Sequence, residues 1–316
     1  MKLSTSESGV AGTSKVKTML SKPRGMSQIK SQQRITIICF LAIPLLLLFV
    51  FTYLPLVDMV RYSFYKWDGY SQMKFIGFDN YITALVQSEY WAAFRTSLYY
   101  LVGSLVQIAI ALFFSTLFCY KMRGRSFFKG VLFFPSLMNG VAIGFVFLYF
   151  FKGGGTLDTI LVAFGVPAKD IPLWLGNINL INISLTFVSV WRYMGQNMVM
   201  FSGATESISG DFFEAAEIDG ANKWQQFWYI ILPNIRGVVA LNLILAVKGA
   251  ISVYEIPFVM TRGSGGSMTY VIKTLHTAFT SRKIGLACAL GVILLIMVLI
   301  ISVIQKRFVE GKEEKA

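Results

Sequence analysis

The stretch ITIICFLAIPLLLLFVFTYLPLV, residues 35–57, decides the class of the fold. It carries no charged side chain, and a helix needs about 20 apolar residues to cross a bilayer. It is too long for the hydrophobic region of a signal peptide, and the YLPLVDM that overlaps its end offers no small-residue cleavage site. The sequence therefore predicts a transmembrane helix that is not cleaved off.

The composition of the whole chain agrees with a membrane protein. Of the 316 residues, 55% are hydrophobic and 14% are charged, and the mean hydropathy is +0.62. A soluble chain of this length could not bury so much apolar surface, whereas a bilayer covers it. The net charge of +13 lies in the gaps between apolar runs and forms no basic stripe with interleaved aromatic residues, so we expect no nucleic-acid partner.

Apolar runs recur along the chain and predict an all-α integral membrane protein with six transmembrane helices. The expected spans are residues 35–57, 93–119, 130–151, 179–200, 237–258 and 284–305. They form a transmembrane domain over 34–306, between a disordered basic tail at 1–33 and a short tail at 307–316. Lys and Arg are more frequent in the tails and in the loops on their side than in the opposite loops. Both termini are therefore predicted to be cytoplasmic.

A polar segment, FEAAEIDGANKWQQFWYIILP at 213–233, interrupts this pattern on the predicted cytoplasmic side. Asp211 precedes Glu214 by three residues, which predicts the capped start of a short helix. Gly220 is expected to end that helix in the left-handed conformation. The segment thus begins with a helix that carries its own start and stop signals.

A second short helix is expected to follow it. Asn222 and Gln225 have the spacing of a capping box, and Pro233 is expected to break the helix before the next span. Phe227 and Trp228 would lie on its apolar side. Two interpretations stay open at this point: a plain turn between spans held by an interfacial helix, or a bracket on which another protein docks.

The segment 211–233 resembles the EAA loop of bacterial ABC importer permeases. The matching residues are Glu214, Ala215, Ala216, Asp219, Gly220, Ala221, Phe227, Leu232 and Pro233. In that family the loop is the coupling helix, which seats in a cleft of a cytoplasmic ATPase subunit and transmits its closure. The resemblance therefore implies that these residues couple the chain to an ATPase from a loop between the fourth and fifth helices.

The resemblance covers nearly the whole chain after residue 34 and points to the carbohydrate importers, in the branch of the maltose, glycerol-phosphate and multiple-sugar permeases. It is carried by PLLLLFVFTYLPLVDMVRYSFYKWDG at 44–69, FIGFDNY at 75–81, FKGVLFFPSLMNGVAIGFVFLYFF at 128–151 and VKGAISVYEIPFVMTRG at 247–263. Two stretches depart from the family. TRGSGGSMT at 261–269 lacks a frequent Gly-Gly-Pro, and FSGATESI at 201–208 lacks a Leu-Ala-Gly-Leu run.

The same resemblance implies the partners and the location. The chain would be a permease subunit of an ATP-driven importer in the bacterial cytoplasmic membrane. It would work with a second permease subunit, a paralogue, and with a cytoplasmic ATPase dimer. An extracytoplasmic substrate-binding protein would deliver a small carbohydrate. ATP and Mg would bind to the ATPase, and no cofactor is expected on this chain.

Ionisable residues inside the spans predict either a pathway or structural ion pairs. A charge at the bilayer centre costs about 2.5–3.5 kcal/mol on insertion scales. We therefore expect Arg192, Lys248 and Glu255 each to have an ion-pair partner or a functional role inside the membrane. The expected pathway residues are Trp191, Arg192, Asn197, Lys248, Tyr254 and Glu255. Aromatic rings, amides and charges suit a sugar, whereas Arg192 together with Lys248 would suit an anion. The sequence leaves these two cases open, and ion pairing as well.

No catalytic or metal-binding pattern accompanies these residues. The stretch GGGTLDT at 153–159 lacks the lysine of a phosphate-binding loop, and His276 and the three cysteines have no metal-binding spacing. We therefore expect neither an enzyme nor a metal site.

Two other function classes stay open. An ion-coupled secondary transporter would use Arg192, Lys248 and Glu255 as its relay, but the internal repeat usual in such proteins is not found in the sequence. A membrane scaffold that transports nothing would make the polar residues inside the spans dispensable.

Overall fold

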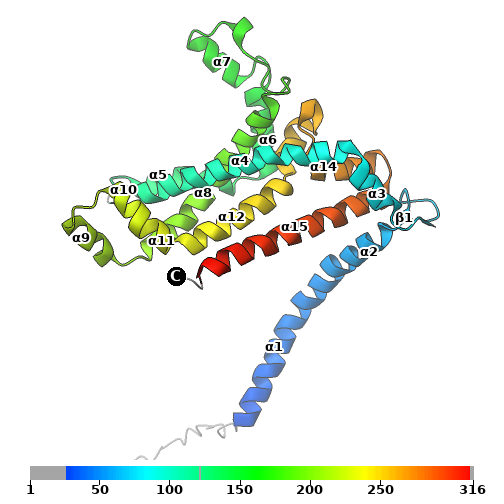
Figure 1. Cartoon of the computed structure of the whole chain (residues 1–316), viewed down its shortest axis with the longest axis horizontal. Coiled ribbons are helices and arrows are strands. Elements are labelled where there is room, and N and C mark those ends of the chain that lie inside the picture. The colour runs from blue at the N-terminus through cyan, green and yellow to red at the C-terminus, as the bar shows by residue number, and fades with distance from the viewer. Residues whose placement is uncertain (1–25, 121, 314–316) are drawn as a thin grey trace, which may run out of the picture. The chain divides into compact units, whose positions relative to one another are not determined.

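The computed structural model describes residues 26–120 and 122–313, and its elements are almost all helices (Figure 1). Most of the predicted basic tail, 1–33, and the end of the C-terminal tail lie outside the described residues. The chain forms two compact units, one up to Val57 and one from Asp58 onward.

The first unit is a single helical run that continues into the second. It comprises α1 (Met26–Leu48), the π-helical turn η1 (Phe49–Tyr53) and the start of α2 (Leu54–Tyr62), whose last residues belong to the second unit. The stretch Thr36–Tyr62 is long and apolar enough to cross a membrane, as predicted for 35–57. The π turn ends two residues before Pro55. A proline ring clashes with the carbonyl four residues earlier in an α-helix, and a wider turn relieves that clash.

The second unit starts with an antiparallel hairpin of β1 (Tyr65–Lys66) and β2 (Lys74–Phe75), in which Tyr65 pairs with Phe75. The helices that follow are α3 (Asp79–Val86), α4 (Ser88–Leu117), α5 (Arg125–Leu137), α6 (Gly140–Phe151), α7 (Thr156–Ala163), η2 (Ala168–Asp170), α8 (Ile181–Glu206), α9 (Gly210–Ile218), α10 (Lys223–Gln226), η3 (Phe227–Ile231), α11 (Leu232–Asn234), α12 (Arg236–Ile251), α13 (Glu255–Thr261), η4 (Ser264–Gly266), α14 (Tyr270–Leu275), η5 (His276–Thr280) and α15 (Ile284–Glu313).

The long helices of this unit lie side by side. In Figure 1, α4 runs along α8 and α12, while α5 lies against α8 and α15 against α12. Two glycines allow close approach: a Cβ on Gly103 would overlap the Thr186 side chain, and one on Gly195 would overlap the Leu132 backbone. The best-buried residues between α4 and α8 include Leu185, Val188 and Tyr100, all at most 4% exposed.

The spans differ from the prediction in three places. The helix expected at 130–151 is a pair, α5 and α6, bent by 97° at Met138 and Asn139. A new helix begins after Asn139, because its side chain accepts a hydrogen bond from the Val141 amide at 2.8 Å and caps α6. The helix expected at 237–258 is interrupted at residues 252–254, between α12 and α13.

The third difference concerns the number of spans. Within the described residues, four helices are long and apolar enough to cross a membrane, or five if the bent pair counts as one. The helix at the expected fourth span, α8, is not among them. Its polar side chains, such as Asn182, Ser184 and Gln196, lower its hydropathy. The membrane character is supported, and six spans remain a prediction.

Candidate functional site

The polar segment between α8 and α12 forms a bracket, residues 209–234, of two short helical pieces. Its first helix, α9, is capped by Ser209, whose hydroxyl accepts a hydrogen bond from the Asp211 amide at 3.4 Å. The prediction that Asp211 provides this cap was therefore wrong. Ser209 has the extended backbone of a cap residue, whereas Asp211 already lies in the first helical turn, where its negative charge suits the helix dipole.

The turn in the bracket follows the prediction closely. Gly220 has φ +77°, and the Ala221 amide donates to the Ala216 carbonyl at 2.8 Å, which is the long bond of a Schellman motif. Asn222 and Gln225 then form a complete capping box. The Gln225 amide donates to Asn222 Oδ1 at 2.9 Å and the Asn222 amide to Gln225 Oε1 at 2.8 Å.

Pro233 does not break the second helical piece where it was expected to. The piece continues through the π turn η3 into α11, and the backbone leaves helical geometry at Ile235, with φ −98° and ψ 8°. The π turn again ends two residues before a proline, as it does at Pro55. The wide turn lets the proline ring fit, so the break falls two residues later.

The bracket presents an apolar surface with charges at its edge. Phe212, Ile218, Trp224 and Tyr229 are 58%, 87%, 67% and 80% exposed. Of the predicted coupling residues, Glu214, Ala215, Asp219, Gly220 and Pro233 are exposed, and Ala216, Ala221, Phe227 and Leu232 are half-buried. Exposed apolar side chains rimmed by polar ones are typical of an interaction site.

One ion pair joins the two halves of the bracket. Lys223 Nζ lies 2.7 Å from Glu217 Oε1, and this hydrogen bond lowers the pKa of the Glu217 carboxyl. Both side chains are exposed, so the pair contributes little to stability.

Tyr120, in the loop between α4 and α5, anchors the bracket to the rest of the unit. Its hydroxyl donates to Gln226 Oε1 at 3.1 Å, and Lys223 Nζ lies 4.1 Å from the centre of its ring. Gln226 is 1% exposed, so the bond is shielded from water. Sequence reasoning missed this anchor because no pattern links two residues that are 106 positions apart.

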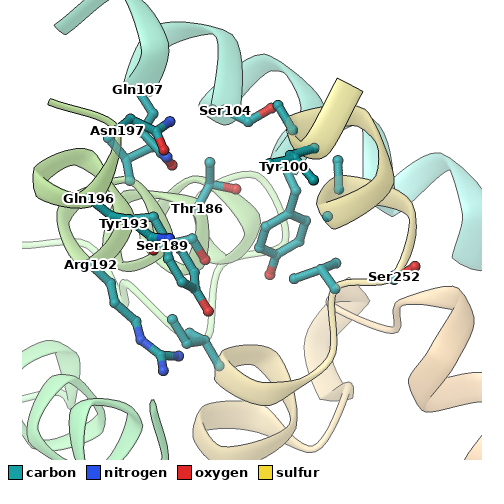
Figure 2. Close-up of a pocket in the computed structure, with 18 of the residues that line it drawn as sticks. Tyr100, Ser104, Gln107, Thr186, Ser189, Arg192, Tyr193, Gln196, Asn197 and Ser252 are labelled. Carbon is teal, nitrogen blue, oxygen red and sulfur yellow. The ribbon is translucent and has the colours of Figure 1, made fainter. Parts of the chain in front are cut away.

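A cavity of about 490 Å³ lies between α4, α8 and α12 and reaches the interruption before α13. Its lining residues are Tyr100, Gly103, Ser104, Gln107, Thr186, Ser189, Val190, Arg192, Tyr193, Gln196, Asn197, Met200, Asn242, Leu245, Ala246, Gly249, Ala250, Ser252, Val253, Tyr254, Glu255 and Ile256. Figure 2 shows the Tyr100 ring from α4 facing Thr186 and Ser189 of α8, with Arg192 at one side. Amides and hydroxyls therefore converge on one space.

An ion pair closes one side of this cavity. Arg192 Nη1 lies 2.5 Å from Glu255 Oε2, and the guanidinium also lies 4.8 Å from the centre of the Tyr193 ring. The Arg192 side chain is 11% exposed and that of Glu255 38%. A Cβ on Gly140, the first residue of α6, would overlap both charged groups. The bend before α6 thus places the Gly140 backbone, which has no side chain, against the ion pair.

Four of the six predicted pathway residues line the cavity. They are Arg192, Asn197, Tyr254 and Glu255. Trp191 is not in the lining and instead packs its ring 5.1 Å from that of Phe147.

Lys248 is exposed, lies outside the lining and takes part in no salt bridge between the described residues. The structure thus brings Arg192 and Glu255 together and leaves Lys248 apart from them.

Sequence reasoning missed the contribution of α4. Tyr100, Ser104 and Gln107 come from a helix that was treated only as an apolar span. A signal was present, because Gln107 stands in the middle of that span and a polar amide facing lipid is costly.

Three buried polar atoms of the lining have no hydrogen-bond partner among the described residues: Tyr100 Oη, Thr186 Oγ1 and Arg192 Nε. Leaving such a group unpaired costs about 1–3 kcal/mol, so native proteins rarely do so without a reason. In the same part of the chain, no three His, Cys, Asp or Glu side chains gather as a metal site would require.

Comparison with known proteins identifies the family. Residues 107–313 match the family described as binding-protein-dependent transport system inner membrane component. The chain belongs to this family. The matched range includes the bracket, α12, α13 and most of the cavity.

Similar proteins have named transport roles. The chain is 30% identical over 280 residues to the probable ABC transporter permease protein YurN of Bacillus subtilis, covering 86% of this chain and 96% of the relative. It is 29% identical over 270 residues to the multiple sugar-binding transport system permease protein MsmF of Streptococcus mutans, covering 84% and 92%. It is 28% identical over 280 residues to the sn-glycerol-3-phosphate transport system permease protein UgpA of Escherichia coli, covering 85% and 92%.

Two solved structures share the fold. One is a bacterial ABC transporter involved in the import of the acidic polysaccharide alginate, with a TM-score of 0.78 at 17% identity, covering 90% of this chain and 99% of that one. The other is an alginate ABC transporter in complex with a periplasmic protein that holds an alginate pentasaccharide, with a TM-score of 0.75 at 18% identity, covering 87% and 94%.

These findings confirm the resemblance drawn from the EAA loop and the flanking spans. They also confirm that the chain is a transport permease and not an enzyme, since its relatives are permease proteins. A multi-pass inner-membrane location is supported by the family and by the apolar helices, while the sides of the two termini remain a prediction.

Proposed function

We propose that this chain is one permease subunit of an ATP-driven importer and forms half of the pathway for a sugar or oligosaccharide. A cytoplasmic ATPase dimer would bind ATP and Mg and dock on the bracket through Glu214 and its neighbours. A second permease subunit, a paralogue, would complete the pathway, and an extracytoplasmic binding protein would deliver the substrate. Several relatives named as sugar permeases, and the solved complex with a periplasmic binding protein, support this assignment.

One observation carries the proposal: the bracket is the covalent link between α8 and α12, and both helices line the cavity. Figure 1 places α9, α10 and α11 at one end of the long helices of this unit and α14 toward the other. The bracket is stiffened by its own caps and tied to the α4–α5 loop by Tyr120. A displacement of the bracket would therefore move the cavity walls, as ATP-driven alternation of access requires.

Purification of the transporter in mild detergent tests the proposal. The Gly220→Ala variant forces a side chain into a backbone conformation with φ +77°, which costs about 1 kcal/mol and distorts the turn. We expect at least a tenfold loss of the co-eluting ATPase and of ATP-driven uptake. Gly203→Ala is the matched control, because Gly203 lies outside the bracket and the cavity lining, with open space around its Cβ position and no positive φ.

The ion-coupled transporter is the alternative. It would need a relay through Arg192, Lys248 and Glu255, but Arg192 and Glu255 bond each other and Lys248 lies outside the cavity lining. Substrate uptake that persists without any ATPase would favour this alternative and overturn the importer.

A further inference from the structure

We propose that the cavity is built for an uncharged polyhydroxy substrate, a neutral saccharide, and that it disfavours acidic ones. This inference rests on the proposed import function, and it names the substrate class of the same cavity. The sequence alone left the choice between a sugar and an anion open, because Arg192 and Lys248 could have acted together.

The charges of the cavity lining decide against an anion. Within the described residues, Arg192 and Glu255 are the charged members of the lining, and they neutralise each other. Lys248, the second cation an anion would need, is exposed and outside the lining. A carboxylate or phosphate in the cavity would have to displace Glu255 from Arg192 and would leave a charge uncompensated, which is strongly unfavourable.

The ion pair is also held in place. The Arg192 guanidinium is mostly buried and lies against the Tyr193 ring. The Gly140 backbone approaches both charged groups so closely that even a Cβ there would overlap them. This side of the cavity leaves no room for a third charged group between Arg192 and Glu255, so an anion could reach Arg192 Nη1 only by displacing the carboxylate. The unpaired Arg192 Nε is itself buried.

The rest of the lining offers neutral groups that both donate and accept hydrogen bonds. Four amide side chains come from three helices: Gln107, Gln196, Asn197 and Asn242. Tyr100 is only 4% exposed, and its hydroxyl has no partner in the described structure; the same is true of the Thr186 hydroxyl. Sugar hydroxyls donate and accept in the same way, whereas an ionised carboxylate only accepts.

Membership of the family does not by itself make this choice. One relative is named for sn-glycerol-3-phosphate and two similar solved transporters for the acidic polysaccharide alginate, while another relative is named for multiple sugars. Any discrimination made by this subunit itself would come from the lining of its cavity. In this chain the single positive charge in that lining is already paired with a carboxylate of the same chain.

Direct binding to the assembled transporter, with the external binding protein left out, tests the inference. The probes are short gluco-, manno- and galacto-oligosaccharides and the same oligosaccharides with C6 oxidised to a carboxylate. We expect at least one neutral saccharide to bind, and its acidic counterpart to bind at least about tenfold more weakly, which is about 1.4 kcal/mol. In Glu255→Gln, which frees Arg192, this ratio is expected to fall by at least about tenfold or to invert.

Glu89→Gln is the matched control. Glu89 is also paired with a basic side chain, Lys273 at 2.8 Å, but it lies outside the cavity lining. The ratio of neutral to acidic binding is expected to stay at the wild-type value in this variant. An equal shift in Glu89→Gln and Glu255→Gln would mean that overall charge, and not the cavity, sets the preference, and would overturn the inference.

Two further results would overturn it. One is an acidic saccharide that binds the wild type as tightly as its neutral counterpart; ATPase co-elution and ATP-driven uptake would then still stand, so the importer assignment would survive. The other is binding of no saccharide at all. If the ATPase also failed to co-elute, the proposed function would fall together with the inference.

Discussion

The bracket and the cavity are neighbours in one unit, yet they are held together in opposite ways. The bracket's caps and its ion pair join residues no more than six positions apart, such as Asn222 with Gln225 and Glu217 with Lys223. The ion pair of the cavity joins residues 63 positions apart. Gly140, which lies against both of them, comes from a third helix. The bracket's caps depend on residues that are close in the sequence, whereas the cavity exists only after its helices have packed.

This contrast suggests that the bracket and the cavity have different mechanical roles. A stiff bracket can transmit a displacement to the helices on either side of it, because its turn is fixed by Gly220 and its second helix by a capping box. A cavity built from packed helices can change shape when those helices move. The bracket is also joined to the long helices, by the Tyr120–Gln226 hydrogen bond and by Phe213 and Ile231, which lie in one hydrophobic cluster with Met198 of α8.

The largest effect is expected from breaking the cavity's ion pair. Arg192→Met leaves the partly buried Glu255 carboxylate without its partner, and we expect a loss of about 3 kcal/mol in the free energy of unfolding. Tryptophan fluorescence during thermal unfolding of the purified complex measures it. The double variant Arg192→Met with Glu255→Leu removes both charges and is expected to recover most of the stability.

If the double variant were no more stable than the single one, the ion pair would not be the source of the loss. The bracket is expected to keep its association with the ATPase in the folded fraction of both variants, because its bonds are local.

A smaller effect is expected from the packing that brings α5 onto α8. A Cβ on Gly195 meets the Leu132 backbone, which cannot move aside as a side chain could. Gly195→Ala is therefore expected to lower the free energy of unfolding by about 1–3 kcal/mol. Gly203→Ala on the same helix is the control, since nothing lies within 4 Å of its Cβ position. Equal melting temperatures for the two variants would refute the close contact.

The smallest effects separate the two regions most sharply. Asn222 caps the second helix of the bracket and Asn139 caps α6 beside the ion pair, and each side chain accepts one amide hydrogen bond. Replacing either with Ala is expected to cost about 1 kcal/mol. Asn222→Ala should weaken ATPase co-elution and leave saccharide binding intact, and Asn139→Ala should do the reverse. ATPase co-elution and saccharide binding are measured for both variants. A variant that lost both would show that the bracket and the cavity are not independent.

Much of the bracket could be predicted from the sequence, because its determinants are short-range. The left-handed Gly220 and the Asn222–Gln225 box lie where their spacing placed them. The two errors were also local in origin. Ser209 was passed over in favour of Asp211, and a π turn postponed the break expected at Pro233.

The cavity could be predicted only in part. Arg192 and Glu255 could be predicted as site residues, because a charged side chain inside an apolar span is costly unless it is paired or functional. That they bond each other, that Lys248 lies apart, and that Tyr100 and Gln107 face the same space depends on the rotation and depth of four separate helices.

By itself the sequence determined that this is a helical membrane protein with a capped polar bracket, because hydropathy and capping act over a few residues or a single helix. Only the tertiary structure decided which polar side chains share a cavity and which charge is already neutralised. Those outcomes depend on close packing between distant segments, such as Gly140 against Arg192 and Glu255. A linear pattern carries no information about which faces of two helices will meet, so the charge balance of the cavity emerged only from the fold.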